Sequence, residues 1–324
     1  MHTPEETFRS LARIPGLTVS RAEPLARHTR FALGGPAEIF AEADAAESFV
    51  AALEAARSSG LPFVILGDGT NVVISDKGFD GIVLRFTGKR IGQDGDSVTV
   101  QAGAPLQDLV DFSVDRGLKG LETLAGIPGS VGGAVYGNAG AYGHSISECV
   151  SRVSFFDGAS VREFDRAACE FRYRESVFKR NKDWIIFETG LLLTPAPCEE
   201  LRSIAGRIVS TRNEKFPPEM KCAGSIFKNL LLAELPGAVA AVVPEEVVRE
   251  GKIPAAWFLD QAGARGMQRG DIHVANYHAN LIYNAGAGTA RELGALIAEL
   301  KQRVRDRFGL ELEEEVQYVG FNNN

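Results

Sequence analysis

The chain has 324 residues with a formal net charge of -7, and 45% of its residues are hydrophobic and 24% are charged. That composition is typical of a folded globular protein, and the length allows two or three substructures. The acidic balance, without a stripe of lysine and arginine, excludes nucleic acid as an expected partner. Charged residues interrupt the stretch from Met1 to Thr18, and the apolar stretch from Leu235 to Pro244 is too short to cross a bilayer. We therefore expect a cytoplasmic protein without a signal peptide or a membrane span, either a monomer or a weak oligomer.

Sequence patterns in the first third predict mixed α and β structure. Short apolar runs predict strands at residues 63–66, 72–75, 81–86 and 97–102, and a one-sided apolar pattern predicts a helix at 105–116. The turn Gly67-Asp68-Gly69-Thr70-Asn71 lies between the first two strands. Its successive N–H groups and the Thr70 and Asn71 side chains are able to surround a phosphate, although Gly-Asp-Gly is also ordinary turn chemistry.

The segment from Gly120 to Gly143 contains eight of the 35 glycines. We expect it to be a loop without regular structure, because glycine adopts positive φ and lets the backbone approach another group closely. A compact domain seldom carries so long a loop without a function, so a bound cofactor is the economical explanation.

The remaining chain is predicted to hold strands between Val150 and Leu193, a helix at 199–213 and a break at Pro217-Pro218. A helix at 289–308 presents one apolar face and ends at Gly309. Apolar and polar residues then alternate, which predicts a final strand from residue 310 to 318. One side of this strand carries Leu310, Leu312, Val316 and Tyr318.

The cysteines show no metal-site spacing. Neither a Cys-x-x-Cys pair nor a histidine at ligand spacing accompanies Cys149, Cys169, Cys198 or Cys222, so we expect reduced thiols and no metal. Cys222 lies three residues before Ser225. Two interpretations stay open for Cys222: an oxidant-sensitive thiol or a buried inert one.

Several motifs occur in a fixed order from about residue 28 to residue 320. They are Arg30 with Leu33-Gly34-Gly35, the two glycine-containing segments, Phe171 to Lys179, Ala223 to Asn229, Leu259 to Gly263, His278-Ala279-Asn280 and Leu312 to Val316. In this order they resemble the UDP-N-acetylenolpyruvoylglucosamine reductase (UDP-N-acetylmuramate dehydrogenase) family. Ordered matches are far more specific than any single motif. One departure from the family is the longer connection from Leu230 to Glu250.

The resemblance implies an α+β fold, in which a two-part FAD-binding domain of the vanillyl-alcohol-oxidase type precedes a smaller α+β substrate-binding domain. The implied division places the FAD-binding subdomains at residues 1–85 and 86–209 and the substrate-binding domain at 210–324. The implied reaction is the NADPH-dependent reduction of UDP-N-acetylglucosamine enolpyruvate to UDP-N-acetylmuramate in peptidoglycan synthesis. FAD would be bound non-covalently, and NADPH would be a co-substrate.

The resemblance also implies binding residues. Those for FAD are Gly67, Gly69, Thr70, Asn71, Gly126, Pro128, Gly129, Gly132, Gly133, Asn138, Ala139, Gly140 and Ala141. Those for the substrate are Tyr173, Lys228, Asn229 and Gln261.

Three catalytic roles follow from the resemblance and suit the chemistry of the reaction. A hydride delivered to a vinyl carbon conjugated to a carboxylate leaves an enolate, whose charge is best stabilised by preorganised groups. The resemblance assigns that task to Arg174 and Glu315 and makes Ser225 the proton donor. Taken alone, Arg174 is an ordinary ion-pair partner and Ser225 a loop hydroxyl or helix cap. Spacing alone does not choose among Glu313, Glu314 and Glu315, and the match to the family selects Glu315.

Two other functions remain as alternatives. An FAD oxidase of the same fold would not need this catalytic set, and covalent flavin attachment is not expected because the glycine-rich region offers only His144 at its edge and no cysteine before Cys149. A nucleotide-sugar binding protein without catalysis would bind the sugar and leave flavin unchanged. His278 is interpreted as a structural hydrogen-bonding residue, since no nucleophile motif accompanies it.

Overall fold

The computed structural model describes residues 2–321 and divides into two compact units, each assembled from separate stretches of sequence. Unit 1 comprises the chain up to Glu23, Ala37–Gly69 and Asp80–Glu214, and unit 2 comprises Pro24–Pro36, Thr70–Phe79 and the chain from Lys215. Helices and strands are mixed in both units, so the predicted α+β class is confirmed. The predicted division at 85/86 and 209/210 stays a prediction.

Unit 1 contains two sheets, with strand orders β1-β2-β5-β3 and β12-β11-β13-β7-β6. Strands β3 and β5 pair in parallel, and the five-stranded sheet is antiparallel throughout. The strands are β1 Leu17–Pro24, β2 Pro36–Ala43, β3 Phe63–Ile65, β5 Phe79–Phe86, β6 Ile91–Asp94, β7 Ser97–Gln101, β11 Val150–Phe156, β12 Val161–Asp165 and β13 Ile185–Leu192. Two-residue ladders join β8 Leu118–Lys119 to β14 Thr194–Pro195 and β9 Gly140–Ala141 to β10 His144–Ser145.

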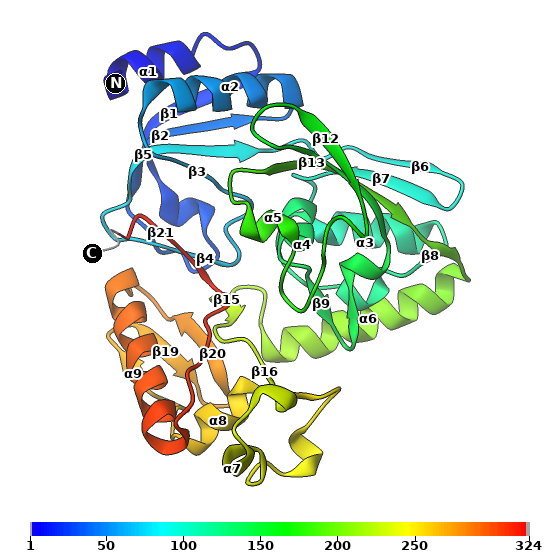
Figure 1. Cartoon of the computed structure of the whole chain (residues 1–324), viewed down its shortest axis with the longest axis vertical. Helices are drawn as coiled ribbons and strands as arrows, with labels where there is room; N and C mark the ends of the chain where they lie inside the picture. Colours follow the sequence, from blue (N-terminus) through cyan, green and yellow to red (C-terminus); the bar gives the residue numbers. More distant parts are fainter. Residues whose placement is uncertain (1, 322–324) are drawn as a thin grey trace. The chain divides into compact units, whose positions relative to one another are not determined.

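Helices of unit 1 begin and end where local chemistry favours it. Thr3 and Glu6 form a reciprocal cap at the start of α1, and Gly60, at φ +73°, ends α2. In Figure 1, α1 and α2 lie beside each other along β1 and β2. The helices are α1 Pro4–Leu11, α2 Ala46–Ser59, α3 Leu106–Asp115, α4 Val131–Tyr136, α5 Val177–Arg180 and α6 Cys198–Lys215.

Three aromatic rings join the two sheets of unit 1 in one core. Phe49 of α2, Phe86 of β5 and Phe187 of β13 pack edge to face, with ring centroids 5.1 to 5.9 Å apart. Edge-to-face packing of buried rings adds stabilisation beyond the area that they bury. These rings thus pack the four-stranded sheet, which contains β5, against the five-stranded sheet, which contains β13.

The expectation of a structureless loop from Gly120 to Gly143 is wrong. This segment contains the helix α4, a short 3₁₀ turn at Glu122–Leu124 and the strand β9. Glycine has a low helix propensity, but Ser130 caps α4 by accepting a hydrogen bond from the Gly133 N–H at 3.3 Å. Val131 and Val135 of the helix are fully buried, so tertiary packing overrides the local preference.

Unit 2 is built on the antiparallel sheet β15-β20-β19-β18, against which the long helix α9 packs (Figure 1). The predicted helix ends are confirmed for α9, because Thr289 and Glu292 cap its start and Gly309, at φ +67°, ends it. The strands are β4 Val72–Ile74, β15 Lys221–Ser225, β16 Leu230–Leu231, β17 Lys252–Ile253, β18 Gln268–Arg269, β19 Ile272–Ala275, β20 His278–Asn284 and β21 Gln317–Val319. The helices are α7 Gly237–Ala240, α8 Ala255–Gln261 and α9 Ala290–Phe308, and 3₁₀ turns lie at Leu25–His28, Leu232–Glu234 and Glu245–Val247.

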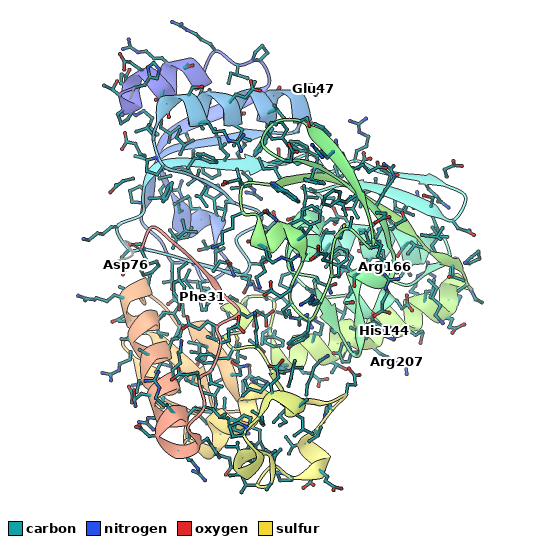
Figure 2. All side chains as sticks on the ribbon, viewed as in Figure 1. Phe31, Glu47, Asp76, His144, Arg166 and Arg207 are labelled. Atoms are coloured by element: carbon teal, nitrogen blue, oxygen red, sulfur yellow. The ribbon has the colours of Figure 1, made fainter. Side chains whose placement is uncertain are left out.

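Two early segments of the chain are fixed to the C-terminal part of unit 2. Asn284 donates from Nδ2 to the carbonyl of Phe31 at 3.1 Å. Phe31 and Asp76, which belong to these two segments, are labelled in Figure 2. The Asp76 carboxylate accepts from the N–H groups of Ala290 and Arg291, at 2.7 and 3.0 Å, and so caps α9. Strand β4 pairs in parallel with β21. Unit 2 is therefore not a contiguous C-terminal domain.

The final strand is shorter than the sequence pattern predicted. Only Gln317–Val319 forms a regular strand, and Tyr318 is 42% exposed, so the prediction of a strand from 310 to 318 is wrong for most of its length. Leu310, Leu312 and Val316 are buried as expected. Here the alternation of apolar and polar residues reflects which side chains are buried. A regular strand forms only where the chain pairs with β4, which is distant in the sequence.

The long connection after Leu230 is a loop whose two ends pair with each other. Strands β16 and β17 pair at its base, and the Leu232 N–H donates to the Gly251 carbonyl at 2.9 Å. Val239 and Val243 are buried in the core of unit 2. The connection is thus folded onto its own unit.

Residues 2–321 include no helix that combines the length and apolar character needed to cross a membrane. Within the same residues, histidine, cysteine and acidic side chains form no group that could hold a metal ion. The four cysteines are free thiols, and three of them are buried.

Candidate active site

The first predicted cofactor turn lies against the second glycine-rich segment in unit 1. A Cβ built on Gly67 would lie 3.2 Å from Oγ of Ser130, the residue that caps α4. Gly69 adopts φ +62°, and Asp68 forms an ion pair with Arg85 at 2.8 Å. The glycines of the turn are thus required by close approach and by backbone conformation. Thr70 and Asn71, the other two predicted residues of this turn, belong to unit 2.

The start of α4 is held tightly against the end of β7. The N–H groups of Val131 and Gly132 donate to the carbonyls of Ala104 and Ala102, both at 2.8 Å. A Cβ on Gly132 would lie 2.9 Å from the Cβ of Ala102, closer than real Cβ atoms approach. Gly132 therefore permits a backbone contact that no other residue allows without a shift.

Substitution of Gly132 by valine is expected to destabilise unit 1 and to lower its flavin content. The added side chain must displace Ala102, and overpacking of this kind costs about 1–3 kcal/mol. Thermal unfolding and flavin absorbance of the purified variant measure both effects. The matched control is Gly206→Ala in α6, where no atom lies within 4 Å and where removing a helical glycine should add about 0.5–1 kcal/mol. Equal melting temperatures for Gly132→Val and the wild type would contradict the expected clash.

The last part of the glycine-rich segment is a tight hairpin. Strands β9 and β10 pair through Ala141 with His144 and through Gly140 with Ser145. The two turn residues, Tyr142 and Gly143, adopt φ +54° and +83°. Positive φ at both central positions is the geometry of a two-residue hairpin turn that matches the strand twist.

Arg174 is brought to this hairpin within unit 1. Its Nη2 donates to the Gly140 carbonyl at 3.0 Å. The Tyr173 ring lies beside the Arg174 guanidinium, which is 5.3 Å from the ring centroid. A predicted catalytic cation, a predicted substrate residue and a predicted FAD residue are thus adjacent.

Ser225 lies at a β-bulge of unit 2. Cys222 pairs with Tyr283, whereas Ser225 pairs with Leu281, so β15 holds one more residue than β20 across this interval. Gly224, at φ +77°, provides the extra residue, and no atom lies within 4 Å of the position of its missing Cβ. Bulges redirect a side chain and occur frequently beside active sites.

Glu315 lies beside the residue that follows Ser225. Its N–H donates to the Ile226 carbonyl at 2.7 Å, and the Lys228 N–H donates to the Glu313 carbonyl at 2.9 Å. Asn71 donates from Nδ2 to the Glu315 carbonyl at 2.9 Å. Unit 2 therefore gathers predicted site residues from three distant parts of the sequence.

The three neighbouring glutamates have different surroundings. Glu313 is 71% exposed and forms an ion pair with Lys228, whose side chain is 11% exposed. Glu314 pairs with Lys301 at 2.9 Å and accepts a hydrogen bond from the Tyr318 hydroxyl. These two carboxylates are engaged in pairs that stabilise unit 2. Lys228, a predicted substrate residue, is bonded to Glu313 through its backbone N–H as well as its side chain.

The other predicted substrate residues of unit 2 make structural contacts. Asn229 Oδ1 accepts from the Ala255 N–H at 3.3 Å, at the start of α8. Gln261, at the end of α8, accepts from Arg307 of α9 through its backbone and side-chain oxygens. These contacts do not test a role in substrate binding, which stays a prediction.

Asn280 is a positioning residue that sequence reasoning recorded only as part of a motif. Its side chain is buried and pairs with the backbone of Phe227 twice: Oδ1 accepts from the N–H and Nδ2 donates to the carbonyl, both at 2.9 Å. An amide that pairs with both backbone groups of one residue replaces a missing strand neighbour. Its place in the motif His278-Ala279-Asn280 was the available sequence signal.

His278 is partly buried beside Phe216, and burial lowers its pKa to about 4, with a smaller contribution from the Lys215 charge. Among the described residues, its Nδ1 has no hydrogen-bond partner. A folded-state pKa below the ordinary value of 6.5 means that the neutral ring stabilises the fold above pH 6.5. This stabilisation is lost as the pH falls toward 4.

His278→Gln is therefore expected to flatten the acid limb of the stability profile. Between pH 6.5 and 4.5, the wild type should lose about 2 kcal/mol more unfolding free energy than the variant. Urea unfolding of both proteins at closely spaced pH values measures the difference. Identical slopes would show that folding does not lower the pKa of His278.

Cys222 is 1% exposed, and burial raises the pKa of its thiol. A buried thiol with a raised pKa is a poor nucleophile, so the structure supports the inert interpretation.

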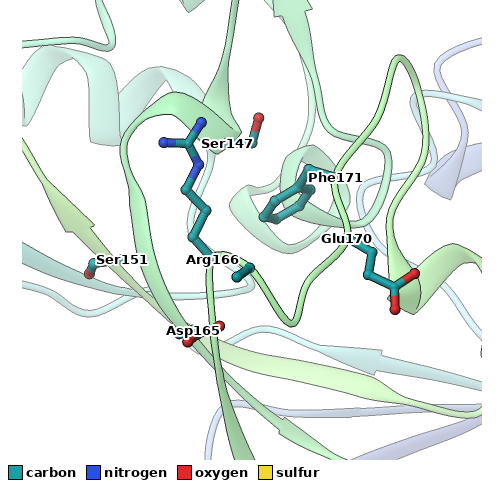
Figure 3. A pocket seen from close by; sticks show the side chains of 7 residues that line it. Ser147, Ser151, Asp165, Arg166, Glu170 and Phe171 are labelled. Atoms are coloured by element: carbon teal, nitrogen blue, oxygen red, sulfur yellow. The ribbon is translucent and has the colours of Figure 1, made fainter.

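A separate open cavity of about 560 Å³ lies in unit 1 outside the predicted residues. Ser147, Ser151, Asp165, Arg166, Glu170 and Phe171 line it. In Figure 3, Arg166 extends toward Ser147 from the segment that follows β12. The lining mixes one cation with two carboxylates and indicates no particular ligand.

Sequence and structural relatives cover nearly the whole chain. The chain is 63% identical over 310 residues to the UDP-N-acetylenolpyruvoylglucosamine reductase of Solibacter usitatus, which covers 96% of this chain and 99% of that protein. It is 32% identical over 308 residues to the reductase of the same name from Bacillus velezensis, at 94% and 95% coverage. The crystal structure of UDP-N-acetylenolpyruvylglucosamine reductase from Thermus caldophilus superposes with a TM-score of 0.72 and 27% identity, covering 94% of this chain and 98% of that one.

Family profiles match both halves of the chain. Residues 37–160 match an FAD binding domain, and residues 216–319 match the C-terminal domain of UDP-N-acetylenolpyruvoylglucosamine reductase. An FAD-binding domain with the glycine architecture described above defines a flavin-dependent oxidoreductase. The chain belongs to the UDP-N-acetylenolpyruvoylglucosamine reductase family, as the ordered motifs predicted.

Proposed function

We propose that this protein uses NADPH and non-covalently bound FAD to reduce UDP-N-acetylglucosamine enolpyruvate to UDP-N-acetylmuramate. The reaction would serve peptidoglycan synthesis in the cytoplasm. The observation that carries the proposal is the pairing in unit 2 of residues 226–228, which directly follow Ser225, with residues 313–315. Membership of the family, at 63% identity to one reductase, supplies the substrate class.

The glycine segments of unit 1 fit FAD. Close contacts at Gly67 and Gly132 and positive φ at Gly69, Gly126 and Gly129 leave the backbone uncovered by side chains. In the turn at residues 67–71, such backbone would present N–H groups to a diphosphate, as an acidic protein requires, whereas the Val131 and Gly132 N–H groups already donate to the carbonyls of Ala104 and Ala102. When bound, FAD supplies the hydride to the vinyl carbon after its own reduction by NADPH.

Arg174 and Glu315 are assigned to the negative charge that develops beside the substrate carboxylate. A guanidinium fixed by Gly140 is preorganised, so it need not reorient as the charge develops. A protonated Glu315 would donate a hydrogen bond to the enolate. Fixed donors of this kind contribute most when water is excluded.

Ser225 is assigned to the final proton transfer. Its Oγ–H bond breaks as a new C–H bond forms at the enolate carbon, and the serine is later reprotonated from solvent. A serine hydroxyl is a weak acid, so the transfer requires a strongly basic enolate within hydrogen-bond reach. The bulge before Ser225 supports this role, because bulges redirect side chains and occur frequently beside active sites.

An anaerobic absorbance experiment tests the proposal. The purified protein is expected to show bound flavin that NADPH bleaches and that UDP-N-acetylglucosamine enolpyruvate restores. Bleaching without restoration by this substrate would favour a different FAD oxidoreductase, and UDP-sugar binding without bleaching would favour a non-catalytic binding protein. Intact mass in denaturant should equal that of the unmodified chain, because the flavin is expected to be non-covalent.

A further inference from the structure

The turn that carries Arg174 has a backbone conformation that needs support. Arg172 and Glu175 close it with reciprocal backbone hydrogen bonds of 3.0 and 3.1 Å. Inside the turn, Arg174 adopts φ +57°, a left-handed conformation that is disfavoured for a residue with a side chain. Non-glycine residues persist in this region only when their surroundings hold them there.

Lys179 provides one such contact. Its Nζ donates to the Arg174 carbonyl at 2.8 Å and pairs with the Glu175 carboxylate at 3.0 Å. The Lys179 side chain is only 14% exposed. Lys179 projects from α5, and Ser176 is the residue immediately before this helix. The Ser176 hydroxyl donates to the carbonyl of Tyr136, in α4, at 2.7 Å. The ammonium therefore approaches the turn from a helix fixed to the glycine-rich segment.

A second contact holds the other end of the turn. Asn138 donates from Nδ2 to the Arg172 carbonyl at 2.8 Å, and its side chain is buried. The Arg174 guanidinium itself donates to the Gly140 carbonyl. The backbone of Arg172 and the side chain of Arg174 are thus both hydrogen-bonded to the segment assigned to FAD.

We propose that Lys179 is a positioning residue for Arg174: its bond to the Arg174 carbonyl holds the left-handed turn and so directs the guanidinium toward the developing charge of the substrate. The inference rests on the role proposed above for Arg174. A hydrogen bond from a charged donor is stronger than one from a neutral donor. The Lys179 ammonium is therefore well suited to stabilise the disfavoured backbone conformation of Arg174. Lys179 acts through Arg174 and does not itself need to contact the substrate.

Lys179→Met tests this inference by transient kinetics. The reduction of bound flavin by NADPH should stay close to the wild-type rate, whereas reoxidation by the enolpyruvate substrate should slow about 10- to 100-fold, as expected for a misplaced catalytic group. Lys179→Arg, which keeps a cationic donor, should retain most of the rate. Lys182→Met is the matched control, because it removes the same charge from an exposed position three residues along the chain.

A double-mutant cycle separates positioning from general structural support. In an Arg174→Met background, Lys179→Met should slow reoxidation no further, because the group that it positions is already absent. The inference would be overturned if the two substitutions slowed reoxidation by independent factors that multiply in the double variant. It would also be overturned if Lys179→Met slowed flavin reduction and reoxidation equally. An Arg174→Met variant with wild-type reoxidation would instead refute the proposed role of Arg174. If Lys179→Met does not fold, the same cycle is measured with Lys179→Gln, whose amide keeps a neutral donor.

Discussion

Ser225→Ala should leave the reduction of flavin by NADPH intact and slow the reoxidation of flavin by UDP-N-acetylglucosamine enolpyruvate about 10²- to 10⁴-fold. This range is typical for the loss of a general acid and corresponds to roughly 3–5 kcal/mol of barrier. Only the second half-reaction needs the proton, so the two rates should separate. Anaerobic stopped-flow absorbance of the flavin measures each half-reaction on its own.

The structure supplies a control for this experiment. Ser203→Ala removes the same hydroxyl from an exposed position of α6, and both of its half-reaction rates should match the wild type. Equal slowing of reduction and reoxidation in Ser225→Ala would contradict the assignment of the proton donor. It would indicate a disturbed bulge at Gly224 and Ser225 instead.

Glu315→Gln should also slow reoxidation, because an amide is a weaker donor to a developing oxyanion than a carboxylic acid; the complete loss of one preorganised donor, about 10²- to 10³-fold, is the upper limit of the expected effect. The glutamine keeps the shape of the side chain but cannot supply an acidic proton. Its backbone bonds to Ile226 and Asn71 should persist, so the melting temperature should change little. Single-turnover reoxidation rates and thermal unfolding test the two parts of this expectation.

Glu314→Gln is the matched control for Glu315→Gln, because it makes the same change one residue earlier. Glu314 pairs with Lys301 and Tyr318, so its loss should lower stability and leave reoxidation close to the wild-type rate. A Glu314 variant that is slower than the Glu315 variant would show that the family match selected the wrong glutamate.

Elements with strong local signals were predictable from the sequence. Helix α9 has a reciprocal cap at Thr289 and a left-handed glycine at Gly309, and its predicted bounds are confirmed to within one residue. Helix α3 likewise lies within the predicted range, at Leu106–Asp115. In both cases the apolar face and the terminating chemistry indicate the same structure.

Two errors share one physical cause, which is that tertiary contacts decided the structure. Helix α4 forms among glycines because Ser130 caps it and Val131 and Val135 are buried. The segment after Leu310 alternates in burial, yet its regular strand begins only at Gln317, where β4 becomes its partner. Neither contact is encoded in the local period of the sequence.

The site was predicted only through the resemblance to the family. Residue spacing could not choose among three glutamates, whereas the structure shows that Glu313 pairs with Lys228 and Glu314 with Lys301. The bond from Lys179 to the Arg174 carbonyl leaves no sequence pattern, because a backbone acceptor has no residue identity. Contacts between a side chain and a backbone group are therefore visible only in the three-dimensional structure.

The parallel pairing of β4 with β21 has a consequence for biosynthesis. Residues 72–74 leave the ribosome about 245 residues before their partners, Gln317–Val319. At about 5–20 residues per second, translation separates the two strands by roughly 12–50 s. Asn71 and Glu315 therefore come into contact only after residue 315 has been translated, and an emerging chain should expose the edge of β4 to chaperones during that interval.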